Sequence, residues 1–248
     1  MSTEDLRLER GHMLAADGLR VRIGSTNILE SVTMKLHRGD FVALSGVNGS
    51  GKSTLLRFLA GAGKGGRSPK PDAGRVLLNG TSVYEDLSHR QRRQLLRDVV
   101  AFLPQKAKEN MLPRETFKYN MLLPFIIAKK AISATRIDEL VDAYGVGRLI
   151  SKPVGSLSGG EQQLVALMGL ELVPEKQLFL LDEPFAALDS ERSDMVSERL
   201  KRLAEAGGLV VMISHRDDEP LATRKIVLQR GSIVSDSVGP GFHSRIDL

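Results

Sequence analysis

A glycine-rich loop near the start of this 248-residue chain limits what the chain can fold into. The stretch SGVNGSGKSTLL, residues 45–56, follows an apolar run and precedes a run with helical spacing. In it, Gly46 is followed by four residues and then by Gly51, Lys52 and Ser53, the pattern G-x-x-x-x-G-K-[ST] between a strand and a helix. The glycines let successive N–H groups point inward, and the helix N-terminus adds positive potential. We therefore predict that this loop holds the phosphates of a nucleotide.

The side chains of the loop have separate expected tasks. Lys52 should reach the outer two phosphates, Ser53 should place its hydroxyl on Mg²⁺, and Thr54 should contact a more inner phosphate. A glycine-rich turn capped by a serine is the purely structural alternative. The predicted nucleotide-binding residues of this stretch are Gly46, Val47, Asn48, Gly49, Ser50, Gly51, Lys52, Ser53 and Thr54.

Three continuously apolar runs indicate the architecture. Residues 40–46, 178–184 and 208–215 are apolar at nearly every position, which is typical of strands buried on both faces of a parallel sheet. Segments with helical spacing lie between them, at residues 53–60, 160–172 and 190–206. This alternation predicts an α/β fold, in which the polar residues at the carboxyl ends of the strands meet at one site.

Two further regions have different patterns. Short alternating segments near the N-terminus, such as residues 19–23, 31–37 and 74–80, predict a small antiparallel sheet. Residues 109–157 have helical spacing and no run that resembles a strand. We predict a single domain over residues 1–248, in which 1–108 and 158–248 form the α/β core and 109–157 form an inserted helical subdomain.

Two adjacent acids end the apolar run LFLLDEP. Asp182 is suited to hold Mg²⁺ through a bound water, and Glu183 adds a carboxylate that can orient and polarise an attacking water. A solvated turn is the alternative interpretation of the pair. A hydrolase is favoured over a kinase, because the sequence supplies a water-activating acid and no evident acceptor site.

Composition excludes some classes of protein. The net charge of +5 and the pI near 9.5 would suit nucleic acid or an anionic membrane, but the basic residues are scattered. The one basic cluster, residues 89–97, is typical of a solvated helix face.

The cysteine content and the apolar runs indicate the compartment. The absence of cysteine agrees with a reducing compartment. No apolar run approaches the roughly 20 residues of a membrane span, and residues 1–13 do not resemble a secretory signal. We expect a cytoplasmic protein without direct nucleic-acid contacts.

The stretch SLSGGEQQLVAL, residues 156–167, relates the chain to a family. Leu157, Ser158, Gly159, Gly160 and Glu161 match the LSGGQ or LSGGE signature, and the chain here resembles the ATP-binding subunits of ABC transporters. The resemblance implies a P-loop NTPase (RecA-like) core, the cofactors ATP and Mg²⁺, and ATP hydrolysis. It also implies a head-to-tail dimer, in which the signature of one subunit closes over ATP held by the loop of the other. Physically, the signature is a second helix N-terminus with a capping serine, and so a second anion-binding surface.

The resemblance covers residues 13–234 and implies three more site residues. Gln105 resembles the glutamine that reaches Mg²⁺ and hinges the helical subdomain, and Asp189 resembles the aspartate that crosses the dimer interface. His215 resembles the switch histidine that contacts the γ-phosphate and steadies the action of Glu183 on water. The implied catalytic residues are Lys52, Glu183 and His215, and the implied metal-binding residues are Ser53, Gln105 and Asp182.

The chain departs from the family pattern at four positions. Ile23 stands where an aromatic residue usually stacks on adenine, so we expect weaker ATP affinity or looser base selectivity. Leu164 and Gly169 stand where arginines are common, which puts the packing of that helix and the hydrolysis rate in doubt. Arg216 replaces an aspartate that often follows the switch histidine.

The helical insertion points to a partner. Residues 111–127 resemble a segment of lipoprotein-release and macrolide-efflux ABC exporters, a match carried by Met111, Leu112, Pro113, Thr116, Asn120 and Pro124. This implies an ATPase subunit that energises a separate integral-membrane permease from the cytoplasmic face, as a homodimer or with a paired ATPase subunit. A soluble ABC-type ATPase acting on nucleic acid, ribosomes or cofactor assembly is the alternative, and a binding module without hydrolysis is a third.

Overall fold

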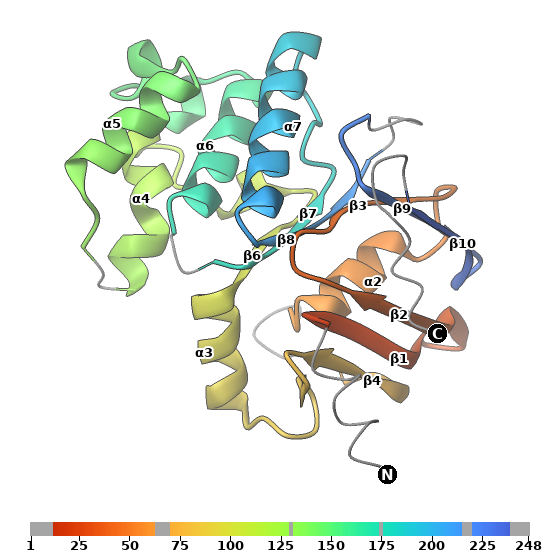
Figure 1. Cartoon of the computed structure of the whole chain (residues 1–248). Coiled ribbons are helices and arrows are strands. Elements are labelled where there is room, and N and C mark those ends of the chain that lie inside the picture. Colours follow the sequence, from red (N-terminus) through yellow and green to blue (C-terminus); the bar gives the residue numbers. More distant parts are fainter. Residues whose placement is uncertain (1–11, 63–69, 129–130, 174–175, 215–219, 239–248) are drawn as a thin grey trace.

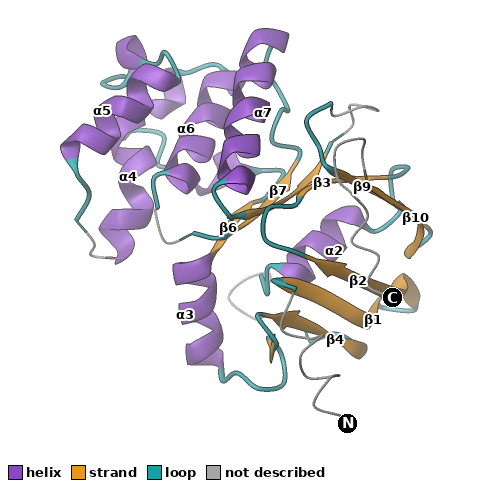
Figure 2. Cartoon of the chain, in the orientation of Figure 1, coloured by secondary structure: helices purple, strands orange, loops and turns teal. Residues whose placement is uncertain are grey.

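A computed structural model describes residues 12–62, 70–128, 131–173, 176–214 and 220–238 of the chain. Two sheets organise these residues, and the helices lie between the sheets and over the outer face of the larger one (Figures 1 and 2). The larger sheet has six strands in the order β10-β9-β3-β8-β7-β6, and the smaller has four in the order β2-β1-β4-β5. The α/β prediction is confirmed, including the small antiparallel sheet.

The six-stranded sheet is parallel except at one edge. Its strands are β3 (Phe41–Ser45), β6 (Val100–Leu103), β7 (Leu178–Asp182), β8 (Leu209–Ile213), β9 (Arg224–Gln229) and β10 (Ser232–Val238). Only β10 pairs antiparallel, with β9. The three apolar runs are thus the strands β3, β7 and β8 at the centre of this sheet, each slightly shorter than predicted.

The alternation of side chains along these strands supplies two separate cores. On one face, Val42, Leu180 and Val211 pack with α2 (Lys52–Leu59) and the antiparallel sheet. On the other face, Phe179 and Val210 pack with the helices that cover that side of the sheet. A strand whose alternate side chains are buried in two different cores must be apolar at every position, which accounts for the continuous apolar runs.

The antiparallel sheet consists of β1 (Leu14–Ile23), β2 (Thr26–Leu36), β4 (Ala73–Leu78) and β5 (Thr81–Ser82). The three predicted segments fall within β1, β2 and β4 or extend just beyond their ends, and the first two strands are longer than predicted. In Figure 1, α2 lies between this sheet and the six-stranded sheet. The phosphate loop therefore opens from the space between the two sheets.

The remaining helices lie partly within and partly outside residues 109–157, the predicted helical subdomain. They are α3 (His89–Val99), α4 (Phe117–Ala128), α5 (Ala134–Ala143), α6 (Gly159–Glu171), α7 (Ser190–Glu205) and 3₁₀ helices at Ala107–Asn110, Gly147–Leu149 and Val154–Ser156. Ser88 and Ser158 begin α3 and α6 with reciprocal capping boxes. The α6 helix packs against α4. Within the described residues, no helix is both long and apolar enough to cross a bilayer.

The basic helix α3 is largely exposed, as predicted, with one exception. Arg92 is 7% exposed and its guanidinium lies 5.0 Å from the ring centroid of Tyr84. Burial raises the pKa of Tyr84 above its usual value, although the nearby Arg92 lowers it. Arg92 thus packs α3 against Tyr84, in the turn that follows β5, instead of joining a basic surface.

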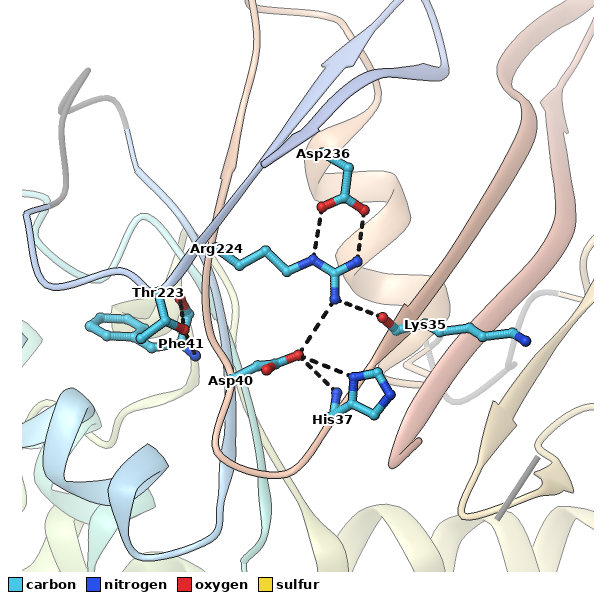
Figure 3. A network of polar contacts seen from close by, with 7 residues as sticks. All are labelled: Lys35, His37, Asp40, Phe41, Thr223, Arg224 and Asp236. Carbon is cyan, nitrogen blue, oxygen red and sulfur yellow. Dashed lines mark hydrogen bonds and ion pairs between the residues drawn. The ribbon is translucent and has the colours of Figure 1, made fainter. Parts of the chain in front are cut away.

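A network of charges fastens the edge of the six-stranded sheet (Figure 3). Arg224, the first residue of β9, donates to both carboxylate oxygens of Asp236 on β10, at 2.8 and 2.7 Å. The same guanidinium donates to the carbonyl of Lys35 at 2.8 Å and forms an ion pair with Asp40 at 3.6 Å. Asp40 also accepts the N–H of His37 at 2.8 Å. The network joins β9 and β10 to the end of β2 and the start of β3.

Candidate active site

The phosphate loop connects β3 to α2, and two of its glycines are required by close backbone contacts. Gly46 has φ 137°, and a Cβ there would lie 2.0 Å from the carbonyl oxygen of Leu228. Gly51 has φ 103°, and a Cβ there would lie 2.8 Å from the carbonyl oxygen of Ile28. No other residue type fits either position without displacing backbone. The loop is therefore held against the β1–β2 hairpin and β9.

Lys52 begins α2 and bends over the loop. The residue is 7% exposed, and its Nζ donates to the carbonyl oxygens of Gly46 at 2.7 Å and Val47 at 3.0 Å. Ser50, in the same loop, has a buried Oγ without a hydrogen-bond partner among the described residues. The loop thus presents an ammonium group and an unsatisfied hydroxyl, both of which suit an anion.

The acid that ends β7 meets the phosphate loop directly. Asp182 is 2% exposed, and its Oδ1 accepts a hydrogen bond from Ser53 Oγ at 3.2 Å. Burial raises the pKa of Asp182, the bond from Ser53 lowers it, and the neighbouring charge of Glu183 raises it further, so that the net direction is upward. A cation placed between Ser53 and Asp182 would act in the opposite direction and lower the pKa of Asp182.

The second acid, Glu183, accepts a hydrogen bond from Gln105, which lies two residues beyond the end of β6. Gln105 Nε2 donates to Glu183 Oε1 at 3.0 Å. The backbone of Glu183 has φ 55°, a left-handed conformation that is costly for this residue, and its N–H donates to the carbonyl of Ile213 on β8 at 3.1 Å. Strained backbone at a strand end is a common feature of active sites. Here the strained turn sets the direction of a carboxylate.

Lys52, Ser53, Gln105 and Glu183 line one cavity of about 310 Å³, and Asp182 is bonded to its wall through Ser53. Its lining brings together the phosphate loop and the acid after β7, as the predicted convergence of the strand ends requires, and adds Gln105, which only the family resemblance had indicated. The lining residues are Ile28, Asn48, Gly49, Gly51, Lys52, Ser53, Thr54, Gln105 and Glu183. The oxygens of Ser53, Gln105 and Asp182 form a donor set that fits Mg²⁺.

The signature residues lie elsewhere and have local structural roles. Ser158 caps α6, and Glu161 accepts the N–H of Ser158 at 2.8 Å. This bond is the main reason that the pKa of Glu161 is lowered. Asp189 caps α7 and accepts the N–H of Arg192 at 2.8 Å. Within the described part of the chain, the signature residues do not line the phosphate-loop cavity.

Four departures from the family pattern have different outcomes in the structure. Ile23 ends β1 and is 62% exposed, and it is Ile28 that lines the cavity. Leu164 is fully buried in the helical core, and a Cβ on Gly169 would lie 3.0 Å from the carbonyl of Met121. Both positions after the signature are thus packing positions. Arg216, like His215, lies outside the described residues.

Sequence reasoning missed three residues around this site. Ile28 lies in the β1–β2 hairpin, whose position over the loop depends on the tertiary structure. Arg57, one helical turn after Ser53, contributes a positive charge that lowers the pKa of Asp182. Gln163 Nε2 donates to the carbonyl of Pro184 at 3.1 Å and so ties α6 to the turn after β7. Of the three residues, only Arg57 could have been found from the sequence, because its i+4 spacing from Ser53 places it one helical turn away on the same face of the helix.

Comparison with known proteins identifies the family. A family model described as ABC transporter matches residues 29–186. The macrolide export ATP-binding/permease protein MacB of Bdellovibrio bacteriovorus is 33% identical over 229 residues, which are 90% of this chain and 34% of MacB. The lipoprotein-releasing system ATP-binding protein LolD 1 of Rhodopseudomonas palustris is 31% identical, over 83% of this chain and 91% of LolD. The chain thus spans about a third of the length of the MacB relatives.

A solved structure extends the similarity to the whole fold. The dimeric ATP-binding cassette MJ0796, in a post-hydrolysis state bound to ADP and Pi, superposes with a TM-score of 0.78 at 28% identity. The match covers 93% of this chain and 100% of the cassette. The family model, the full-length relative and the shared fold agree. The chain belongs to the ATP-binding cassettes of the ABC transporter family.

Proposed function

We propose that this chain is the ATP-binding and ATP-hydrolysing subunit of an ABC transporter and that it energises a membrane permease by ATP-driven dimerisation. One observation carries the proposal: the phosphate loop bonds to Asp182, the last residue of β7, and shares one cavity with Glu183, the residue that follows it. Ser53 bonds to Asp182 at 3.2 Å, and Gln105 bonds to Glu183 at 3.0 Å. A loop that binds phosphate and a carboxylate that can act on water are thereby held side by side.

Nucleotide binding would exchange internal bonds for stronger ones. Lys52 would leave the carbonyls of Gly46 and Val47 and donate to phosphate oxygens, so that its ammonium group would meet negatively charged acceptors in place of neutral ones. The loop N–H groups and the N-terminus of α2 would hold the inner phosphates. Ser53, Gln105 and Asp182 would hold Mg²⁺, which neutralises phosphate charge when bound.

Hydrolysis assigns a task to each remaining group. Glu183 would turn from Gln105 to a water molecule, orient its oxygen toward the γ-phosphorus and accept its proton as the bond to ADP breaks. Lys52 and the loop N–H groups would stabilise the charge on the transferring phosphoryl group. His215, by family resemblance, would contact the γ-phosphate.

A second cassette completes the site in this proposal. The N-terminus of α6, with Ser158, Gly159 and Gly160, would cover the ATP held by the loop of the other copy, and Asp189 would lie at the interface. The dimeric state of MJ0796 bound to ADP and Pi supports this arrangement. The partner is either an identical chain or a paired ATPase subunit.

The α4 helix offers a surface for the permease. Apolar side chains remain exposed on it, with Ile126 at 47% and Ile127 at 71%. Beside them lies a groove of about 270 Å³ between α4, α6 and the end of β6, which we call the α4 groove. Its lining residues include Phe102, Pro104, Asn110, Met111, Asn120, Leu123, Pro124, Ile127 and Gly169.

Exposed apolar surface such as that of α4 and the α4 groove marks an interaction site. We propose that a permease of the macrolide-efflux or lipoprotein-release type docks here and holds the chain at the cytoplasmic face of the membrane.

An ATPase assay of the purified chain with Mg·ATP tests the chemistry. Hydrolysis should fall by roughly 10²- to 10⁴-fold in Glu183→Gln, the usual effect of losing a general base, while ATP binding persists. Glu198→Gln, an exposed acid on α7, is the matched control and should retain full activity. A wild-type chain that binds ATP without hydrolysing it would be a binding module, contrary to the proposal.

Affinity capture tests the partner. The Glu183→Gln variant with Mg·ATP, added to detergent-solubilised cells, should retain one multi-span membrane protein. Recovery of ribosomes or nucleic acid instead would favour the soluble ABC-type ATPase.

A further inference from the structure

The buried side chain of Asn120 fixes the conformation of the segment that precedes α4. Asn120 is 7% exposed and lines the α4 groove. Its Oδ1 accepts the N–H of Leu112 at 2.7 Å. Its Nδ2 lies within bonding distance of the carbonyls of Leu112 at 3.0 Å, Glu115 at 3.3 Å and Thr116 at 3.0 Å. One side chain thereby satisfies the backbone of a whole turn.

The turn held by Asn120 pairs in its own right with residues 152–155. The N–H of Gly155 donates to Pro113 at 2.8 Å, and the N–H of Val154 donates to Glu115 at 2.9 Å. The fit is close, because a Cβ on Gly155 would lie 3.0 Å from the carbonyl oxygen of Pro113. Residues 112–116 therefore determine where residues 152–155 can lie.

Residues 154–157 in turn are bonded to the signature helix. Gln162 Nε2, on α6, donates to the carbonyls of Val154 at 3.1 Å and Leu157 at 3.3 Å. Ser158 follows at once and caps α6. A continuous set of hydrogen bonds thus leads from the α4 groove, through Asn120 and the paired segments, to the residues that begin the signature.

We propose that Asn120 is a positioning residue, which lies in the α4 groove and determines the position of the signature at the start of α6. A partner that occupies the groove therefore affects closure of the dimer. The inference rests on the proposed function and adds to it the route between partner and nucleotide. A buried amide whose four contacts are all to backbone specifies a conformation more strictly than apolar packing does, because each unmet contact leaves a buried polar group unpaired. The phosphate loop is not on this route.

The test separates ATP binding from dimer formation in the Glu183→Gln background. Asn120→Ala should leave the affinity for a fluorescent ATP analogue within about twofold, because the phosphate loop is untouched. It should weaken ATP-dependent dimerisation, measured by sedimentation, at least about tenfold. Amide hydrogen exchange at residues 154–157 should become faster. Tyr144→Phe, which removes a different buried hydrogen bond in the helical region, should change neither nucleotide affinity nor dimerisation.

Unchanged dimerisation in a folded Asn120→Ala protein would overturn the inference, as would parallel losses of ATP binding, dimerisation and thermal stability. If Asn120→Ala does not fold, Gly155→Ala tests the same route from its other side and should weaken dimerisation alone. Failure of both variants to fold would show that the route serves stability only. Absence of ATP binding or dimerisation in the Glu183→Gln parent would instead contradict the proposed function.

Discussion

The Cα of Gly160 lies so close to Ala187 that a Cβ on the glycine would stand 2.4 Å from the Ala187 carbonyl oxygen. Ala187 is held in the left-handed region with φ 66°, in the turn that leads from Glu183 to α7. The neighbouring glycine of the signature is less confined, because a Cβ on Gly159 would lie 3.5 Å from the Cβ of Ala187. The second signature glycine is therefore required within a single subunit, whatever it does for a second one.

This contact predicts a difference between two alanine variants. Gly160→Ala should lower the free energy of unfolding by about 1–3 kcal/mol, since the backbone of the Ala187 turn must move. Gly159→Ala is the matched control and should change it by about 0.5 kcal/mol or less. Urea unfolding of both variants measures the difference. Equal effects would mean that the α6–α7 contact is looser than this structure has it.

Asp182→Asn should stabilise the chain when no nucleotide is bound. The pKa of Asp182 is raised on folding, so the folded state binds the proton more tightly than the unfolded state does. Protonation therefore stabilises the fold below the unfolded-state pKa, and this contribution is lost as pH rises through the folded-state pKa. Asn removes the buried charge, while its carbonyl can still accept from Ser53.

Thermal melts of wild type and Asp182→Asn at several pH values measure this effect. The variant should melt higher at neutral pH by on the order of 1–4 °C, and the difference should shrink toward acid pH. Mg·ATP should stabilise the wild type much more than the variant. A variant that melts lower than the wild type at neutral pH would show that the charged form is favoured in the folded state.

Ile23→Tyr should tighten ATP binding. Ile23 is 62% exposed at the end of β1, so the aromatic ring of tyrosine can replace its side chain without displacing core atoms. Stacking on a base contributes about 1–3 kcal/mol, which corresponds to roughly 5- to 150-fold in affinity. Titration with ATP and GTP measures both the gain and the selectivity, with Ile23→Ala as the control. Unchanged affinity in the Tyr variant would show that the base does not lie over Ile23.

Arg199 and Glu171 should form a strongly coupled pair. Arg199 Nε donates to Glu171 at 2.9 Å, its guanidinium lies 4.7 Å from the Tyr144 ring centroid, and Tyr144 Oη donates to the same carboxylate at 2.9 Å. The side chains of the pair are 17% and 13% exposed. Replacing Arg199 alone by Met leaves a poorly solvated carboxylate and should cost about 3–5 kcal/mol.

The double variant Arg199→Met, Glu171→Met tests the coupling. It should be more stable than the sum of the two single losses predicts, because no unpaired charge is left. Denaturant unfolding of all four proteins provides the cycle. Additive losses would mean that solvent reaches the pair and that its members act independently.

Much of the site followed from local sequence. The phosphate loop, the capping serine of α6 and the two acids at the end of β7 each depend on backbone geometry within a few residues, where glycine, serine and buried strand residues have strong preferences. The three apolar runs identified the parallel strands because a strand covered on both faces has no position that tolerates polarity. Lys52, Ser53 and Glu183 consequently line one cavity, together with Gln105, which the family resemblance had indicated.

The contacts between distant segments were decided by the tertiary structure. That Ile28 lines the cavity, that Gly169 faces Met121, and that Asn120 satisfies residues 112–116 depend on how separate elements pack. Local pattern alone determined which residues can turn, cap or span the core, since those preferences belong to single residues and their near neighbours. Packing decided which of these residues meet. An apolar side chain can pack against many other residues, and a buried amide can form hydrogen bonds with many groups, so only the complete fold selects the partner.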